Sequence, residues 1–186
     1  MNINEQEFQV NGLHYTIRSA VKEDAKRLSE LRLQVDGETE HMDRVPGEAF
    51  IDEAGFEKII KTDTNHPRNI CLVAEAAGQI VGYSRCAGND LQRFMHKVEF
   101  GVGVLKQHWG FGIGKNLLKT SISWADANGI TKIILSGVLE TNESAIRLYK
   151  SLGFEVEGLL KKDRILSDGK YYSTYMMARY ADYAPD

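Results

Sequence analysis

The segment QHWGFGIGKNLLKTSISWADANG, residues 107–129, decides the fold, because three closely spaced glycines lead directly into a strongly patterned helix. Glycines at a helix start let the backbone approach another group closely. The first N–H groups of a helix have no partner within it, and with the helix dipole they favour an anion. The segment therefore predicts an anion site followed by a helix that Gly129 ends. The predicted buried face consists of Ile113, Leu117, Leu118, Ser121, Trp124 and Ala125.

Two common phosphate-binding motifs do not fit this segment. A Walker A loop, G-x-x-x-x-G-K-[ST], needs glycine where Trp109 stands and a hydroxyl residue where Asn116 stands. The dinucleotide fingerprint needs G-x-G-x-x-G and an acidic residue at the end of the following strand. The spacing here is G-x-G-x-G and that acidic residue is missing, so both interpretations are excluded.

The composition predicts one ordinary globular domain over residues 1–186, with 42% hydrophobic and 26% charged residues. A net charge of -3 and a pI near 6.0 argue against a general nucleic-acid binder. No apolar run is long enough for a membrane span, and the first residues lack the features of a signal peptide. Cys71 and Cys86 form no CxxC pair, which indicates reduced thiols and a cytoplasmic location. Neither cysteines nor histidines have metal-ligand spacing, so we expect no metal.

Hydrophobic periodicity divides the first third of the chain into a strand and two helices. Residues 13–20 alternate as a half-buried strand does, and residues 22–35 repeat at helical spacing. Residues 36–47 are polar and punctuated and indicate a loop, and a second helix is expected over residues 48–62. The buried face of the first helix is predicted to carry Ala25, Leu28, Leu31 and Val35.

Strands dominate after His66-Pro67. Residues 69–88 predict a hairpin that turns at Ala77-Gly78. Residues 94–105 predict a third strand, in which Gly101 and Gly103 suggest a bulge or a close backbone contact.

The last third of the chain follows the glycine-rich helix. Residues 131–139 predict a buried strand, and residues 142–154 a short helix closed by Gly153. Residues 155–162 and 170–180 predict two strands around a turn. The order β, α, α, β, β, β, α, β, α, β, β is mixed α/β rather than a regular doubly wound repeat.

Two segments resemble one known family. WGFGIG, residues 109–114, is similar to the pyrophosphate loop of the GNAT superfamily of acyl-CoA-dependent N-acetyltransferases, whose pattern is [Q/R]-x-x-G-x-[G/A] after a bulged strand; here Trp109 takes the first position. NESAIRLYKSLGFEVEG, residues 142–158, resembles the family's Asn-capped helix with a tyrosine, then L-G-F and a strand. The resemblance runs from Tyr15 to Met177. It implies a GNAT fold: a central, mostly antiparallel sheet with a bulged, splayed strand pair, flanked by about four helices.

The resemblance implies transfer of an acetyl group from acetyl-CoA to a primary amine of a small molecule or a protein N-terminus, by direct attack in a ternary complex. Strand backbone groups would contact the pantetheine arm, and one N–H would polarise the thioester carbonyl. Successive loop N–H groups would hold the diphosphate. Tight strand-to-helix packing also explains the glycines, and a simple helix cap also explains the asparagine. The implied cofactor-binding residues are Val102, Gly103, Val104, Gly110, Phe111, Gly112, Ile113, Gly114, Lys115 and Asn142.

Three residues are candidates for proton transfer. Tyr149 matches the family position that commonly protonates the departing thiolate, although a core tyrosine is the alternative. The general base is open between Glu99, His96 on the same predicted strand with opposite side-chain parity, and neither. Glu99 also has Lys97 and Arg85 as potential ion-pair partners.

The acceptor and the assembly stay open. The acidic residues Asp36, Glu38, Glu40 and Asp43 would favour a cationic amine, or form an ordinary solvated loop. The alternative function is a non-catalytic acyl-CoA sensor or interaction domain, and an acyl donor longer than acetyl is a third option. The resemblance is compatible with a homodimer through residues 170–180, but core packing explains their aromatic side chains equally well.

Overall fold

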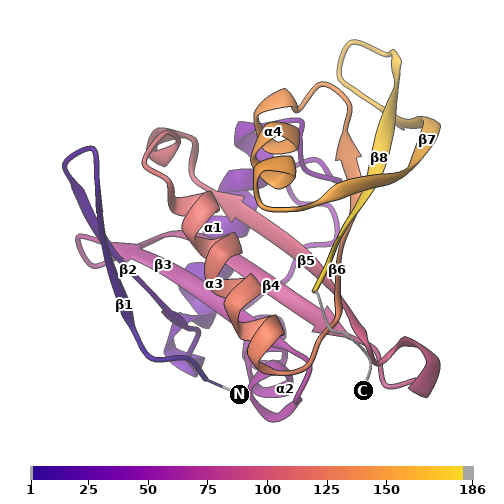
Figure 1. Ribbon diagram of the computed structural model, residues 1–186. Helices are drawn as coiled ribbons and strands as arrows, with labels where there is room; N and C mark the ends of the chain where they lie inside the picture. The colour runs from indigo at the N-terminus through magenta and orange to yellow at the C-terminus, as the bar shows by residue number, and fades with distance from the viewer. Residues whose placement is uncertain (1, 182–186) are drawn as a thin grey trace.

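One eight-stranded sheet organises the computed structural model, which describes residues 2–181 (Figure 1). The strand order is β1-β2-β3-β4-β5-β6-β8-β7, antiparallel throughout except between β5 and β6. The strands are β1 (Gln6–Val10), β2 (Leu13–Ser19), β3 (Ile70–Ala76), β4 (Gln79–Gly88), β5 (Lys97–Val104), β6 (Lys132–Leu139), β7 (Glu155–Ile165) and β8 (Tyr171–Tyr180). The α-helices are α1 (Ala25–Glu38), α2 (Glu53–Asn65), α3 (Ile113–Ala127) and α4 (Glu143–Ser151). Short 3₁₀-helices are η1 (Lys22–Asp24), η2 (Gln92–Phe94) and η3 (Lys106–His108).

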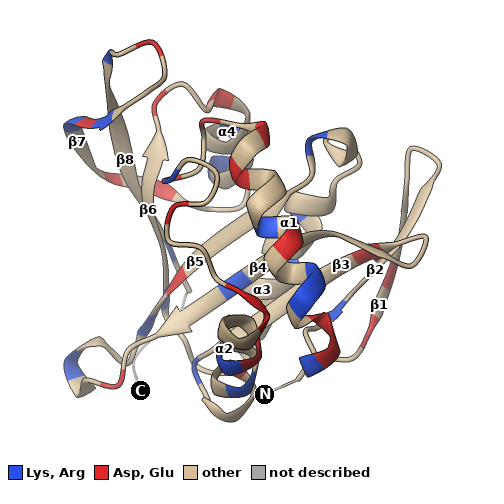
Figure 2. Ribbon diagram, turned by 180° about the vertical axis from the view of Figure 1, so that it is seen from behind, with Lys and Arg blue, Asp and Glu red and all other residues tan. Residues whose placement is uncertain are grey.

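Helices cover the middle strands on both faces. Helix α3 lies on one face, where Ser84 of β4 meets the Ser121 hydroxyl at 3.3 Å. Helices α1 and α2 lie on the other face, as the two opposite views show (Figures 1 and 2). Every residue predicted for the buried faces of α1 and α3 is buried. Charged residues of both signs are spread over helices, loops and the β7–β8 hairpin (Figure 2). Among residues 2–181, no helix has the length and apolar character that a membrane crossing requires.

The predicted order of elements is confirmed from residue 13 onward, but the prediction omitted β1. This strand joins β2 through Asn11-Gly12, where both residues have positive φ angles of 51° and 83°. Asn-Gly between two alternating segments is the sequence signal of such a hairpin. The predicted hairpin at Ala77-Gly78 is confirmed, with φ angles of 48° and 77°.

Several predicted boundaries are wrong by a few residues. The predicted loop begins later, because α1 continues to Glu38. The second helix begins at Glu53 rather than at residue 48, because the Asp52 side chain caps it by accepting from the Gly55 N–H at 2.8 Å. Strand β5 begins at Lys97, so His96 precedes it.

Strands β5 and β6 form a fork. They pair only from Lys97 to Glu99 on β5, opposite residues 132–134 of β6, and diverge beyond that point (Figure 1). The expected splayed pair is therefore present. The predicted bulge on β5 is wrong, because β5 pairs with β4 in unbroken register. At the fork, a register shift lies instead on β6 between Leu135 and Val138, where Gly137 has a φ of 71°.

The two glycines of β5 differ in their surroundings. A Cβ atom on Gly103 would lie 2.9 Å from Cε1 of Tyr83 and 3.3 Å from Cγ1 of Val35. A Cβ atom on Gly101 would have no neighbour within 4 Å. Gly103 therefore serves a close contact with the Tyr83 ring, whereas Gly101 leaves open space over the sheet.

We predict that Gly103→Ala lowers the free energy of unfolding by about 1–3 kcal/mol, because the added methyl group overpacks the contact with Tyr83. Gly101→Ala is the matched control, and it should leave stability unchanged or raise it by up to about 1 kcal/mol, since alanine loses less backbone entropy in a strand. Urea denaturation of both variants measures the difference. Equal stability of the two variants would contradict the packing role of Gly103.

Candidate active site

Two pockets meet at the fork between β5 and β6. The face pocket, about 390 Å³, lies on the sheet face that α1 and α2 cover, and Arg32, Tyr83, Arg85, Glu99 and Gly101 are among its lining residues. The loop pocket, about 420 Å³, is lined by the glycine-rich loop, the end of β5 and the start of α4. The residues shared by both pockets are His41, Met42, Val102, Asn142 and Tyr149.

The fork exposes backbone groups of β5. The Leu105 N–H donates to the Val81 carbonyl at 3.0 Å, which makes this facing pair hydrogen-bonded. Because such pairs alternate along an antiparallel ladder, the N–H and C=O of Val102 and Val104 point away from β4, into the fork. The indole N–H of Trp109 donates to the Val104 carbonyl at 2.8 Å. The backbone of Val102 therefore faces the junction of the two pockets.

The glycine-rich loop presents N–H groups to the loop pocket. Its carbonyls are held by the β1–β2 hairpin, since the Asn11 amide donates to Gly110 at 3.1 Å and the Tyr15 hydroxyl to Phe111 at 3.3 Å. The first N–H groups of α3, from Ile113 onward, have no partner within the helix. This arrangement is suited to an anion.

The φ angles favour a different placement of the pyrophosphate-loop pattern quoted above. Gly110 and Gly112 have φ angles of 85° and 73°, whereas Gly114 lies inside α3. Placing Gly110 and Gly112 at the two glycine positions puts Gln107 in the first position, where the pattern asks for Gln or Arg. The pattern then fits without a departure, two residues earlier than the placement on Trp109.

The structure brings most of the predicted cofactor residues together. All of them except Phe111 line the loop pocket. The Phe111 ring packs against the hydrophobic core instead. Asn142 caps α4, because its side-chain oxygen accepts from the Ala145 N–H at 3.3 Å, and its amide nitrogen has no partner among the described residues.

Tyr149 lies at the junction of the two pockets, with 9% of its surface exposed. Its ring packs against Phe154 with centroids 5.9 Å apart. Burial raises the pKa of Tyr149 to about 12, so the phenol is protonated at neutral pH. Its hydroxyl has no hydrogen-bond partner within residues 2–181, which leaves the proton available to a ligand.

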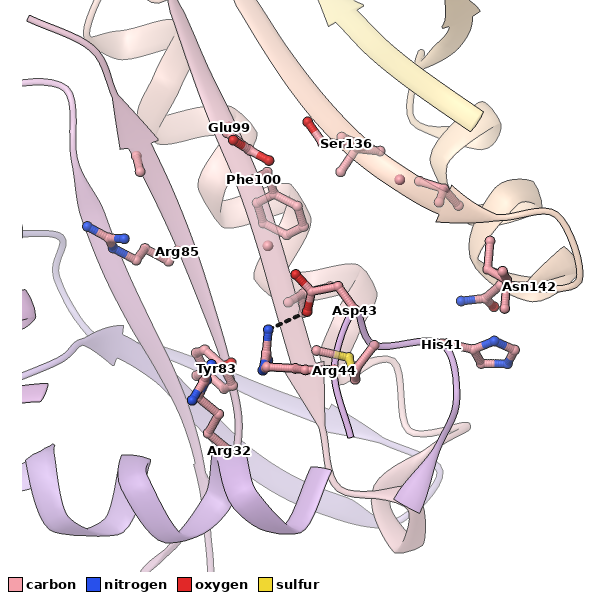
Figure 3. A pocket seen from close by; sticks show the side chains of 18 of the residues that line it. Arg32, His41, Asp43, Arg44, Tyr83, Arg85, Glu99, Phe100, Ser136 and Asn142 are labelled. Atoms are coloured by element: carbon pink, nitrogen blue, oxygen red, sulfur yellow. Dashed lines mark hydrogen bonds and ion pairs between the residues drawn. The ribbon is translucent and has the colours of Figure 1, made fainter. Parts of the chain in front are cut away.

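The two candidate bases lie in different places. Glu99 lines the face pocket at the point where β5 and β6 diverge (Figure 3), and it forms no ion pair among the described residues. Arg85 instead pairs with Asp63 at 2.6 Å, and Lys97 lies over the Phe94 ring. His96 is exposed in the turn before β5 and lines neither pocket, so its position gives it no access to the junction.

The acidic residues between positions 36 and 43 form contacts within the protein. Asp36 and Asp43 both pair with Arg44, Asp36 through two contacts of 2.8 and 2.9 Å. Glu38 accepts from the Lys106 N–H at 2.6 Å, and Glu40 from the Ser167 N–H at 2.8 Å. These contacts hold the loop in place. The face pocket is instead lined by arginines, namely Arg32, Arg44, Arg85 and Arg164.

His41 and Arg164 are site residues that sequence reasoning missed. His41 lines both pockets, and burial lowers its pKa, so its ring is neutral at pH 7. Arg164 of β7 donates to the carbonyls of His41 and Met42 at 3.3 and 3.2 Å. A single histidine in a polar loop and an arginine late in a strand carry no local sequence signal for these contacts.

Comparison with known proteins gives consistent results. The sequence model described as the acetyltransferase (GNAT) family matches residues 21–154. The L-amino acid N-acetyltransferase AaaT of Escherichia coli (strain K12) is 33% identical over 108 residues, which are 58% of this chain and 66% of that protein. The matched part spans 49–66% of the length of four curated relatives.

Two solved structures share most of the fold. An acetyltransferase of the GNAT family from Streptococcus pneumoniae has a TM-score of 0.85 at 27% identity, covering 90% of this chain and 99% of that chain. The structure of yncA, a putative acetyltransferase from Salmonella typhimurium with its cofactor acetyl-CoA, has a TM-score of 0.78 at 26% identity, covering 92% and 98%.

Proposed function

The chain belongs to the GNAT family of acetyltransferases, and we propose that it transfers an acetyl group from acetyl-CoA to a primary amine of a small molecule. One observation carries this proposal: the fork between β5 and β6 joins the loop pocket, whose N–H groups are suited to an anion, to the face pocket, with Tyr149 at the junction. Two reactants bound in these pockets would meet there, which suits direct transfer in a ternary complex.

The loop pocket fits coenzyme A. The N–H groups at the start of α3 and the dipole of this helix would hold the diphosphate, and the exposed Lys115 would add a charge. Gly110, whose Cβ would have no neighbour within 4 Å, leaves room for close approach. The pantetheine arm would follow the open edge of β5 past Val104 and Val102. The acetyl-CoA that the Salmonella relative holds is consistent with this assignment.

The reaction we propose forms a C–N bond and breaks the thioester C–S bond. The neutral amine attacks the carbonyl carbon, and the Val102 N–H stabilises the negative charge on oxygen. Glu99 accepts the amine proton through water, and Tyr149 gives a proton to the departing sulfur. With a phenol pKa of about 12 against roughly 8.5 for a thiol, complete transfer is uphill by about 5 kcal/mol. The hydroxyl therefore acts as a hydrogen-bond donor that releases its proton only as the C–S bond breaks.

We expect free CoA to be released when acetyl-CoA is mixed with a suitable amine. A thiol-reactive dye would measure release over a panel headed by L-amino acids, the acceptors in the name of the E. coli relative. Calorimetry with acetyl-CoA alone measures cofactor binding. Binding without release for every amine would favour the sensor function instead, and the absence of both would refute the assignment of the loop pocket.

Tyr149→Phe should lower kcat by about 10²-fold or more, because the variant keeps the ring and loses the proton donor. Its acetyl-CoA dissociation constant should stay within about twofold of the wild-type value. Tyr175→Phe is the matched control, since Tyr175 is a partly buried tyrosine that lines neither pocket. A kcat equal to that of the control would remove Tyr149 from the mechanism.

Glu99→Gln should lower kcat/KM at pH 7 by about 10²–10⁴-fold, because glutamine keeps the shape of the side chain but accepts no proton. The deficit should shrink as pH rises toward the amine pKa, since more acceptor arrives already neutral. Rates of CoA release from pH 6 to 10 test this, with the exposed Glu155→Gln as control. Glu99 is not the base if the loss of kcat/KM in Glu99→Gln is the same at every pH. The same conclusion follows if His41→Gln, rather than Glu99→Gln, shows a loss of kcat/KM that becomes smaller as pH rises.

A further inference from the structure

Arg32 is a buried cation without an acidic partner. It lies on α1 with 8% of its surface exposed, and it lines the face pocket. One of its N–H groups donates to the Ala49 carbonyl at 2.7 Å, and among residues 2–181 it forms no ion pair. A guanidinium has five N–H groups, and burying its charge without a counter-ion is unfavourable. The arrangement calls for an anion from outside the chain.

Two of the other three arginines of the face pocket already have acidic partners. Arg44 is paired with Asp36 and Asp43, and Arg85 with Asp63 (Figure 3 shows the contact between Arg44 and Asp43). These two cations are therefore neutralised.

Arg164, the third of these arginines, binds neutral backbone groups rather than a carboxylate. It binds two loop carbonyls, and its Nη2 atom would lie 2.7 Å from a Cβ on Gly137, at the β6 bulge. It is also less buried than Arg32, and it lines a second pocket together with residues of the loop after α1. Of the unpaired cations in the face pocket, Arg32 is the one that water screens least.

Tyr83 provides a second donor next to Arg32. The two side chains lie beside each other in Figure 3, on the α1 side of the pocket. Burial raises the pKa of Tyr83, so its hydroxyl stays protonated, and the hydroxyl has no partner among the described residues. Its ring is fixed by the contact with Gly103. A guanidinium and a fixed hydroxyl together match the oxygens of a carboxylate.

The face pocket thus has unpaired charges of opposite sign, with Glu99 at the fork and Arg32 deeper under α1. We propose that the acceptor is a small amino acid whose carboxylate binds Arg32 and Tyr83 while its amine lies between Glu99 and the thioester. This inference rests on the proposed acetyl transfer and adds its acceptor class. A volume of about 390 Å³ suits such a molecule, and a protein N-terminus would bring no carboxylate to Arg32.

The test compares an amino acid with its own amide as acceptors in the wild type, in Arg32→Gln and in Arg32→Lys. The ratio of kcat/KM for acid over amide should fall by about 10²-fold in Arg32→Gln, the size expected for one charge-assisted hydrogen-bonded pair. Arg32→Lys should retain part of the ratio. Comparing the ratio between variants cancels the difference in basicity between the two amines.

A purely structural role for Arg32, holding the Ala49 carbonyl, predicts a different result. Acid and amide would then lose activity by the same factor, the ratio would not change, and the proposal would be overturned. Arg164→Gln is the matched comparison, because it also removes one arginine from the face pocket; we expect its ratio to stay within about threefold of wild type. If Arg164→Gln removes the preference for the acid over the amide and Arg32→Gln retains it, the assignment of Arg32 as the anchor is wrong.

Failure of this inference is separable from failure of the proposed function. Equal kcat/KM for acid and amide in the wild type would refute the carboxylate anchor and leave acetyl transfer intact. If neither acceptor is acetylated, calorimetry measures the dissociation constants of the acid and the amide for the wild-type protein saturated with CoA. Equal binding of the two, or tighter binding of the amide, would refute the carboxylate anchor. If Arg32→Gln does not fold, Tyr83→Phe provides the second variant, with an expected fall in the ratio of about tenfold.

Discussion

The whole arrangement depends on one open edge in the middle of a sheet. Backbone N–H and C=O groups inside a protein require partners, and a sheet normally supplies them from the next strand. Here β6 leaves β5 after Glu99, so the groups of Val102 and Val104 face a gap rather than a strand. The Val104 carbonyl accepts a hydrogen bond from the Trp109 indole N–H instead of from a neighbouring strand. Beyond the point where it leaves β5, β6 has its own irregularity in its pairing with β8, between Leu135 and Val138, where Gly137 has a positive φ.

The alternation of β5 separates two tasks along one strand. Residues whose backbone groups bond to β4, such as Glu99, Gly101 and Gly103, direct their side-chain positions toward α1 and α2. Val102 and Val104 direct their backbone toward the fork and their side chains toward α3. The side-chain positions therefore form the face pocket, and the alternate backbone groups border the loop pocket. On that face Gly101 leaves open space, and Gly103 makes room for the Tyr83 ring.

Local patterns in the sequence predicted most of the fold and part of the site. Helical spacing gave the buried faces of α1 and α3 because burial follows the period of the helix directly. Gly101 and Gly103 were expected to mark a bulge or a close contact, and local sequence does not distinguish the two; at Gly103 the close neighbour is the Tyr83 ring. Local patterns do not encode the contacts that arrange the loop after α1. These are the ion pair between Asp36 and Arg44 and the hydrogen bond from Arg164 to the His41 carbonyl, which also places His41 at the site.

Arg32 shows that a buried charge without a counter-ion can identify a functional residue that no sequence motif identifies. In the sequence it is one more cation in a helix, one residue after the buried Leu31. Among residues 2–181 its one hydrogen-bond partner is the neutral Ala49 carbonyl, whereas Arg44 and Arg85 of the same pocket are each paired with a carboxylate. A buried ion without a counter-ion lowers the stability of the free protein, and an anion that binds there restores it in proportion to its affinity. Arg32 lines the face pocket, so a ligand bound there can remove this deficit.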